Sequence, residues 1–106
     1  MSLSSKIQRL KEALASEDDP DLLKSGKAIL SGMTFFKLGI NSSLAKKRYQ
    51  EHCSGCEYNV TDPVEDMRET DTQIPDASDK MCSHCGGCVL AYKLRQNVIK
   101  CEFWDE

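Results

Sequence analysis

Long apolar runs and aromatic side chains are scarce in this 106-residue sequence. Aromatic residues make up 7% of the chain and apolar residues 40%. No apolar run approaches the roughly 20 residues that a membrane-spanning helix needs, and the first ten residues lack the apolar stretch of a signal peptide. We therefore expect a soluble protein that is not exported and has no membrane partner.

Cysteine is absent from the first 52 residues and then occurs six times. A protein that stays inside the cell keeps its thiols reduced, so metal binding is favoured over a disulfide framework. The apolar supply is thin for a second half that must also fold. We expect a metal to brace residues 51–106.

Acidic residues are absent from positions 80–100, although the net charge of the chain is −3. Residues 1–50 carry nine basic and five acidic side chains, and residues 51–106 carry five basic and twelve acidic ones. Residues 57–79 hold eight of those acids, and we interpret them as a solvated excursion. The net charge argues against a protein devoted to nucleic acid.

The first 50 residues are predicted to be helical, with about three helices. One apolar stripe with helical spacing predicts the first helix, with Ser5 and Gln8 as its capping box; it consists of Leu3, Ile7, Leu10 and Leu14. A second helix is expected to start at Pro20 or Asp21. Gly26 and Gly32 are expected to weaken or end it.

A third helix is predicted over Leu44–His52, with a cap within Asn41–Ser43. Its basic cluster, Lys46, Lys47 and Arg48, is interpreted as a solvated helical face. A phosphate-contacting site is the alternative.

Two Cys-x-x-Cys pairs, Cys53/Cys56 and Cys82/Cys85, are separated by 25 residues. This spacing lets two tight turns supply four thiolates to one zinc ion at about 2.3 Å. These four cysteines are the first choice for a structural zinc site. Gly86, directly after the second pair, is typical of a zinc knuckle.

Cys88 and Cys101 complete the set of six candidate metal ligands. They are either buried apolar residues beside one zinc or further ligands in a two-zinc arrangement. His52 and His84 are left outside the site. Phe103 and Trp104 are expected to cover it, and an exposed Trp104 that anchors a partner is the alternative.

An iron–sulfur cluster is the main rival to zinc, because Cys82-x-x-Cys85-Gly-x-Cys88 is similar to a ferredoxin cluster-binding loop, with Cys101 as a remote fourth ligand. That loop normally continues with Cys-Pro, whereas Val89 and Leu90 follow here. It would also leave Cys53 and Cys56 without a role. Zinc is therefore preferred.

The second half, about residues 44–104, resembles small zinc-ribbon-type proteins of tailed bacteriophages. The matching residues are Arg48, Cys53, Cys56, Cys82, Cys85, Gly86, Cys88, Leu90, Lys93, Cys101 and Trp104. Gly87 departs from that pattern, because it places Cys88 one residue further out. The resemblance implies metal binding, a phage origin and a location in the host cytoplasm or the virion, and it implies no activity.

The sequence thus predicts a small metal-stabilised α+β domain, with helices in residues 1–50 and a zinc-ribbon or zinc-knuckle region in residues 51–106, together forming one compact unit. No deaminase or thioredoxin-like motif has its required context, so no enzyme is expected. The preferred function is a protein-interaction module acting on transcription or replication machinery. A structural virion component and a nucleic-acid-binding protein using Lys46, Lys47, Arg48, Lys93, Arg95 and Lys100 are the alternatives.

Overall fold

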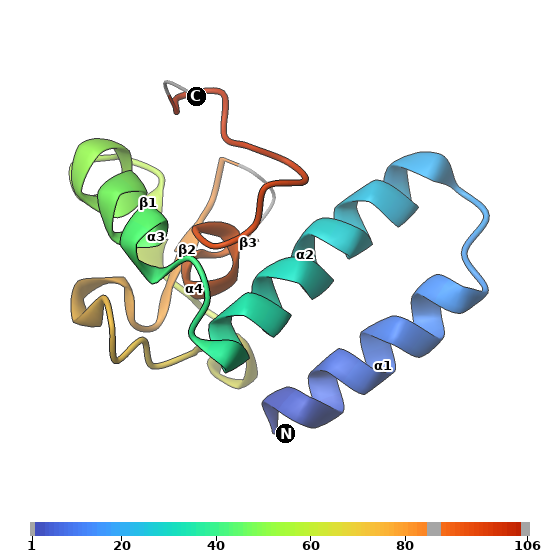
Figure 1. Ribbon diagram of the computed structural model, residues 1–106. Helices are drawn as coiled ribbons and strands as arrows, with labels where there is room; N and C mark the ends of the chain where they lie inside the picture. Colours follow the sequence, from blue (N-terminus) through green and yellow to red (C-terminus); the bar gives the residue numbers. More distant parts are fainter. Residues whose placement is uncertain (1, 85–87, 105–106) are drawn as a thin grey trace.

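Two helices at the start of the chain form an antiparallel hairpin. The computed structural model describes residues 2–84 and 88–104, in which α1 covers Leu3–Ala15 and α2 covers Pro20–Leu38 (Figure 1). The predicted start of α2 is confirmed, but the cap of α1 is Ser2, whose Oγ accepts a hydrogen bond from the Ser5 amide at 3.2 Å. Neither helix, nor any other in the described part, is long and apolar enough to cross a membrane.

Helix α2 continues past both Gly26 and Gly32, which were expected to weaken or end it. A Cβ atom on Gly32 would lie 2.3 Å from the carbonyl oxygen of Tyr92, so this glycine lets α2 approach the backbone of a later helix closely. Phe36, one turn further along, packs edge-to-face on Tyr92 with ring centroids 5.7 Å apart. The helix ends at Gly39, whose φ of 70° is the left-handed conformation that terminates many helices.

The third helix, α3, covers Ser42–Arg48 and continues into a π-helical turn, η1, over Tyr49–Cys53. Asn41 occupies the cap position with a φ of 62°, but its side chain makes no capping bond. Its Nδ2 donates instead to the carbonyl oxygen of Arg95 at 3.0 Å. The start of α3 is therefore tied to the backbone just after residue 94, far away in the sequence.

A three-stranded antiparallel sheet follows, which confirms the α+β class. Strands β1 (Asn59–Thr61), β2 (Lys80–Cys82) and β3 (Cys88–Val89) lie in the order β1-β2-β3. A four-residue helix that the sequence reasoning did not predict, α4 (Leu90–Lys93), comes directly after β3, and all four of its residues are buried.

The acidic excursion between β1 and β2 is mostly exposed, as expected, but part of it is buried and structured. It contains two 3-10 turns, η2 (Glu65–Met67) and η3 (Pro75–Ala77). Asp71, Ile74 and Ala77 are all buried. Asp71 accepts hydrogen bonds from the amides of Gln73 and Ile74, so the turn before η3 is built on its carboxylate.

The core consists of two apolar clusters that meet at α4. The larger cluster contains Ala45, Tyr49, Ile74, Ala77, Cys82, Leu90, Leu94, Cys101 and Trp104. The smaller one contains Met33, Val89, Ala91 and Tyr92, with Leu3, Ile7, Leu10 and Phe36 packed against it. Leu90 belongs to the first cluster, and the next two residues of α4 belong to the second. The N-terminal hairpin and the cysteine-rich half are thus packed on the same short helix.

Candidate metal centre

The first cysteine pair lies where a helix loosens into a turn. Cys53 is the last residue of η1, and Cys56 lies in the turn that follows. The amide of Cys56 donates to the carbonyl oxygen of Cys53 at 3.1 Å. The side chain of Asn59 donates to the same carbonyl at 3.0 Å and to the Tyr49 hydroxyl at 3.3 Å. The backbone at Cys53 is therefore held by a strand residue six positions away.

The second cysteine group lies at the end of the sheet. Cys82 and Cys88 are direct partners in the β2–β3 register. Side chains at directly opposite positions of antiparallel strands project to the same side of the sheet, so these two cysteines share a face. Cys85, a member of the first-choice zinc site, lies outside the described residues.

Cys101 is brought back to the sheet by a buried glutamine. The Gln96 side chain accepts from the amides of Val98 and Ile99 at 2.9 and 2.8 Å, and it donates to the carbonyl oxygen of Lys93 at 3.2 Å. These bonds turn the chain after α4, so that Cys101 reaches the larger core cluster. Sequence reasoning did not identify Gln96, because nothing in its local pattern marks it as buried.

Three cysteines that are far apart in the sequence are associated with that cluster. Cys82 and Cys101 belong to it, and Cys53 packs against it. Burial raises the pKa of the Cys53 thiol to about 11, and the charges of Cys101 and Cys82 also raise it. A contact with Trp104 and the positive charge of Lys93 act in the opposite direction. Each of these groups is therefore close enough to influence the sulfur of Cys53.

Trp104 is buried in the cluster with Cys82 and Cys101, and Phe103 is exposed. Trp104 is 6% exposed, whereas Phe103 is 47% exposed. The indole N–H faces Cys53 and lowers the pKa of its thiol, but the geometry is too loose for a full hydrogen bond. Nε1 has no other acceptor among the described residues. Trp104 thus carries a buried donor directed at the cysteine cluster.

Phe103 instead joins two other rings on the outside of the cysteine-bearing loops. Its ring is parallel to that of Tyr58, with centroids 6.2 Å apart, and lies 5.0 Å from the ring of His84. His84 Nε2 is 2.5 Å from the carboxylate of Glu102. His52 lies elsewhere, beside Glu51 at 3.8 Å. The side chain of His84 therefore contacts this outer layer of rings and the carboxylate of Glu102.

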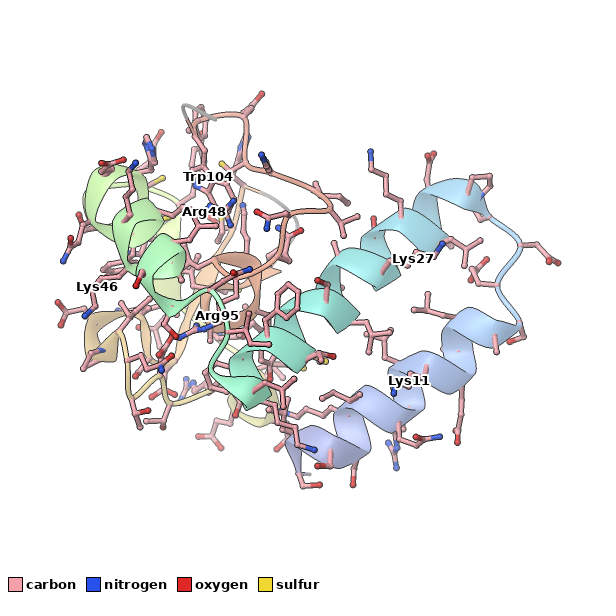
Figure 2. The ribbon with its side chains drawn as sticks, viewed as in Figure 1. Lys11, Lys27, Lys46, Arg48, Arg95 and Trp104 are labelled. Atoms are coloured by element: carbon pink, nitrogen blue, oxygen red, sulfur yellow. The ribbon has the colours of Figure 1, made fainter. Side chains whose placement is uncertain are left out.

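Two buried cations, Arg48 and Lys93, flank Trp104. Arg48 thus departs from the expectation that the basic cluster of α3 is solvated, whereas Lys46 and Lys47 are exposed as expected. Arg48 is 1% exposed, and its guanidinium carbon lies 4.3 Å from the centroid of the Trp104 ring (Figure 2). Lys93 Nζ lies 5.9 Å from the same centroid. Arg48 Nη1 donates to the carbonyl oxygens of Leu94 and Gln96 at 2.9 and 3.0 Å. Arg48 therefore fixes the backbone that carries Cys101.

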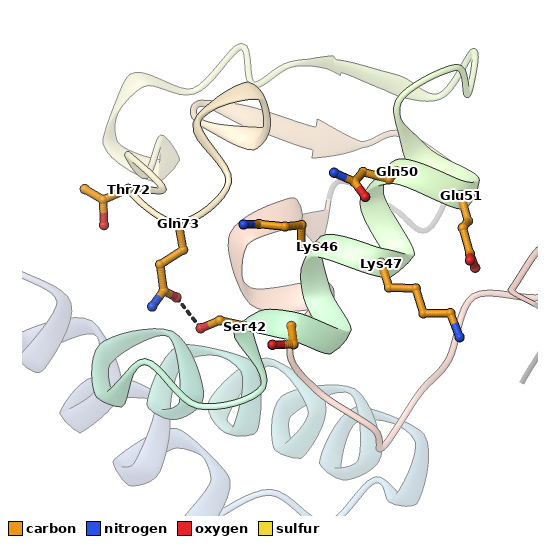
Figure 3. Close-up of a pocket in the computed structure, with 8 residues that line it drawn as sticks. Ser42, Lys46, Lys47, Gln50, Glu51, Thr72 and Gln73 are labelled. Carbon is orange, nitrogen blue, oxygen red and sulfur yellow. Dashed lines mark hydrogen bonds between the residues drawn. The ribbon is translucent and has the colours of Figure 1, made fainter.

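The six cations proposed for nucleic-acid contact do not form one surface. Arg48, Lys93 and Arg95 are buried, and Arg95 pairs with the buried Asp71. Lys46 and Lys47 line a shallow polar pocket of about 550 Å³, where Lys46 extends toward Gln73 and Lys47 extends along the other side of α3 (Figure 3). The exposed basic surface on this helix is thus reduced to two lysines.

Residues 2–84 and 88–104 contain no group of three or more Cys, His, Asp or Glu side chains placed so that they could hold a metal ion. Cys53, Cys82 and Cys101 share one cluster, Cys88 adjoins Cys82 across the sheet, and Cys56 is half-buried three residues after Cys53. Cys101 is more closely associated with Cys53 and Cys82 than its separate position in the sequence suggested. A search of family models, curated proteins and solved structures found no significant match to this chain.

Proposed function

We propose that this chain is a non-enzymatic zinc protein in which cysteine-bound zinc braces the second half of the fold. The observation that supports this most directly is that Cys82, Cys101 and Trp104 belong to one core cluster and that Cys53 packs against it. These residues come from η1, β2 and the C-terminal segment, so a single ion bound there would cross-link three parts of the chain. Metal binding of this kind supplies folding free energy directly.

Burial favours the neutral thiol at Cys53, whereas a bound metal ion deprotonates a coordinating thiol, and two features near Cys53 would stabilise the resulting thiolate. Zinc takes four thiolates in its closed structural sites. Thiolates bound to a metal accept N–H bonds from neighbouring groups, and the directed but loosely placed indole N–H of Trp104 is a donor of that kind. Four thiolates around one Zn²⁺ leave a net charge of −2, and the nearby positive charges of Arg48 and Lys93 would offset it.

The ligand set that we now prefer differs from the one that spacing alone favoured. Cys53, Cys82 and Cys101 form its constant part, and the fourth thiolate comes from Cys56, Cys85 or Cys88. All six cysteines remain candidates, because a second ion would use the cysteines that the first one leaves. An iron–sulfur cluster on the same residues is the rival proposal.

A zinc closed by four thiolates has no open position for a substrate, so we propose binding rather than catalysis. The partner would be another protein, with transcription or replication machinery as the preferred class and a virion component as the alternative. The likeness to phage zinc-ribbon proteins that the cysteine pattern carries agrees with this, and it would place the protein in the host cytoplasm. Burial of three of its six candidate cations disfavours nucleic acid as the main partner.

Elemental analysis of the protein, purified without added metal or chelator, tests the proposal. We expect a colourless protein with one or two zinc atoms per chain. A brown protein that contains iron and acid-labile sulfide would establish the iron–sulfur alternative. A protein that holds no metal, and keeps its fold in a strong chelator, would contradict both.

A further inference from the structure

The outer ring layer is formed by Tyr58, His84 and Phe103, which come from three different segments. Tyr58 directly precedes β1, His84 follows β2, and Phe103 lies in the C-terminal segment. The ring centroid of His84 is 4.7 Å from that of Tyr58 and 5.0 Å from that of Phe103. The third pair, Tyr58 and Phe103, is parallel with centroids 6.2 Å apart. All three separations fall in the range of about 4.5–7 Å at which aromatic rings interact.

This layer is exposed, and its backbone is held in place. Phe103 is the most exposed Phe, Tyr or Trp residue in the described part of the chain, and His84 is exposed as well. The amide and the hydroxyl of Ser83 both donate to the carbonyl oxygen of Tyr58, at 2.9 and 3.3 Å. Aromatic residues are enriched in protein interfaces, because they supply a large contact area with few rotatable bonds. The layer is therefore a candidate contact surface for a partner.

Two carboxylates border the outer ring layer. Glu102 Oε1 lies 2.5 Å from His84 Nε2. The negative charge of Glu57 raises the pKa of the Tyr58 hydroxyl, and the charge of Glu102 raises it as well. Both carboxylates therefore act on the same ring, and both residues are exposed.

Lys and Arg side chains of the described residues do not pair with Glu57 or Glu102. Residues 85–87 and 105–106, which adjoin the same loops in the sequence, include two acids and no base. Residues 51–106 as a whole carry twelve acidic and five basic side chains. The field around the outer ring layer is thus expected to attract cations and to repel anions.

A guanidinium group fits an aromatic surface that is bordered by carboxylates. Its flat face stacks on rings, and its N–H groups donate two parallel hydrogen bonds to a carboxylate, which the ammonium group of lysine does not do. We propose that the outer ring layer, together with Glu57 and Glu102, binds an arginine side chain in a basic segment of the partner protein, a proposal that rests on the protein-interaction role given above and specifies the chemistry of that partner.

Acetyl-triarginine amide is the probe, and the same peptide with citrulline in place of each arginine is the control. Citrulline keeps the planar end of the arginine side chain but has no charge. Titrated into the isotope-labelled protein as purified, triarginine should cause saturable backbone amide NMR shifts centred on the residues of the outer ring layer. The citrulline peptide should bind at least about tenfold more weakly.

Two exposed glutamates provide a matched pair of charge variants. Glu57 borders the outer ring layer, whereas Glu65 lies in η2, beside α1. Glu57→Gln should weaken triarginine binding about two- to fivefold, and Glu65→Gln, which removes the same charge, should leave it unchanged. Phe103→Leu keeps an apolar side chain but removes the ring, and it should also weaken binding about two- to fivefold. Elemental analysis gives the zinc content of each variant.

Three results would overturn the proposal. Equal weakening by the two glutamate variants would show that the peptide follows the net charge of the protein. Equal binding of the arginine and citrulline peptides would show that the surface does not select a cation. Tighter binding of oligothymidylate than of triarginine would indicate a single-stranded nucleic acid instead. If the protein holds zinc and gives one of these results, the metal proposal stands and this one falls. A folded, metal-free protein that binds triarginine as expected would contradict only the metal proposal.

Discussion

Arg95 and Asp71 form a two-point ion pair with N–O distances of 2.8 and 3.0 Å, and each side chain is 1% exposed. The guanidinium also donates to the carbonyl oxygen of Ala91 at 2.8 Å and to Gln73 Oε1 at 3.1 Å. The pair therefore joins the loop before η3 to the end of α4. Residues 71 and 95 lie in parts of the chain that seemed independent in the sequence.

Replacing Asp71 with Ala should destabilise the protein by about 3–5 kcal/mol, because it leaves the Arg95 charge buried without its carboxylate. Urea unfolding measures this loss. The double variant Asp71→Leu, Arg95→Met should lose less than the sum of the two single variants. Additive losses would show that the pair does not act as a unit.

Gly32→Ala and Gly26→Ala should differ sharply although both glycines are buried in α2. A Cβ on Gly32 would meet the backbone oxygen of Tyr92 at 2.3 Å, whereas a Cβ on Gly26 would meet the end of the flexible Leu14 side chain at the same distance. We expect Gly32→Ala to cost about 1–3 kcal/mol. At Gly26 the gain of up to about 1 kcal/mol in helix propensity should offset the contact. Thermal unfolding compares them, and equal effects would contradict the close approach of α2 and α4.

Loss of zinc on single Cys→Ser substitution should identify the ligands. Cys53, Cys82 and Cys101 should each be indispensable, and the three remaining cysteines should reveal which one completes the site. Metal content after gel filtration is the measurement. A Cys101→Ser protein that keeps its zinc at unchanged affinity would contradict the ligand set proposed above.

Trp104→Phe should lower zinc affinity about 10–100-fold, because it removes the indole N–H that faces Cys53 and keeps a ring beneath Arg48. Competition with a chromophoric chelator measures the affinity. Phe103→Leu is the matched control, because Phe103 is exposed and belongs to the outer ring layer. An equal loss in the two variants would assign the effect to aromatic packing rather than to the N–H group.

Tyr92 should make the fold sensitive to high pH. Burial raises the pKa of its hydroxyl, and the hydrogen bond and the negative charge of Glu69 raise it further. The folded state therefore favours the neutral phenol, so this contribution is fully present below the unfolded pKa of about 10 and is lost as pH rises above it. The free energy of unfolding should fall less steeply above pH 10 in Tyr92→Phe than in the parent protein. Parallel pH profiles would exclude this role for Tyr92.

Local patterns predicted the start of α2 and the position of α3 well, because Pro20 and the polar residues before α3 act on their own neighbours. The same reasoning failed at Gly32, since the carbonyl that explains this glycine belongs to Tyr92, sixty residues later. Gly39 was a usable sequence signal for the end of α2, and it was overlooked.

The cysteine spacing indicated which residues to consider for a metal but not how they are grouped. Cys101 belongs to the same core cluster as Cys82 because Arg48 and Gln96 hold the backbone between α4 and the C-terminal segment. Both side chains are buried through contacts with main-chain groups, and one-dimensional charge patterns give no sign of that. Arg48 in particular had the appearance of a surface residue beside two lysines.

The placement of α4 has a consequence for the order of folding. Residues 88–104 supply members of both apolar clusters, the Arg95 side of the buried ion pair and the Trp104 cover. During synthesis, the α1–α2 hairpin emerges from the ribosome long before the segment on which it packs. The nascent chain should therefore remain open, with the Met33 face of α2 unprotected, until residue 104 has been released. Folding would begin only once nearly all of these residues are available.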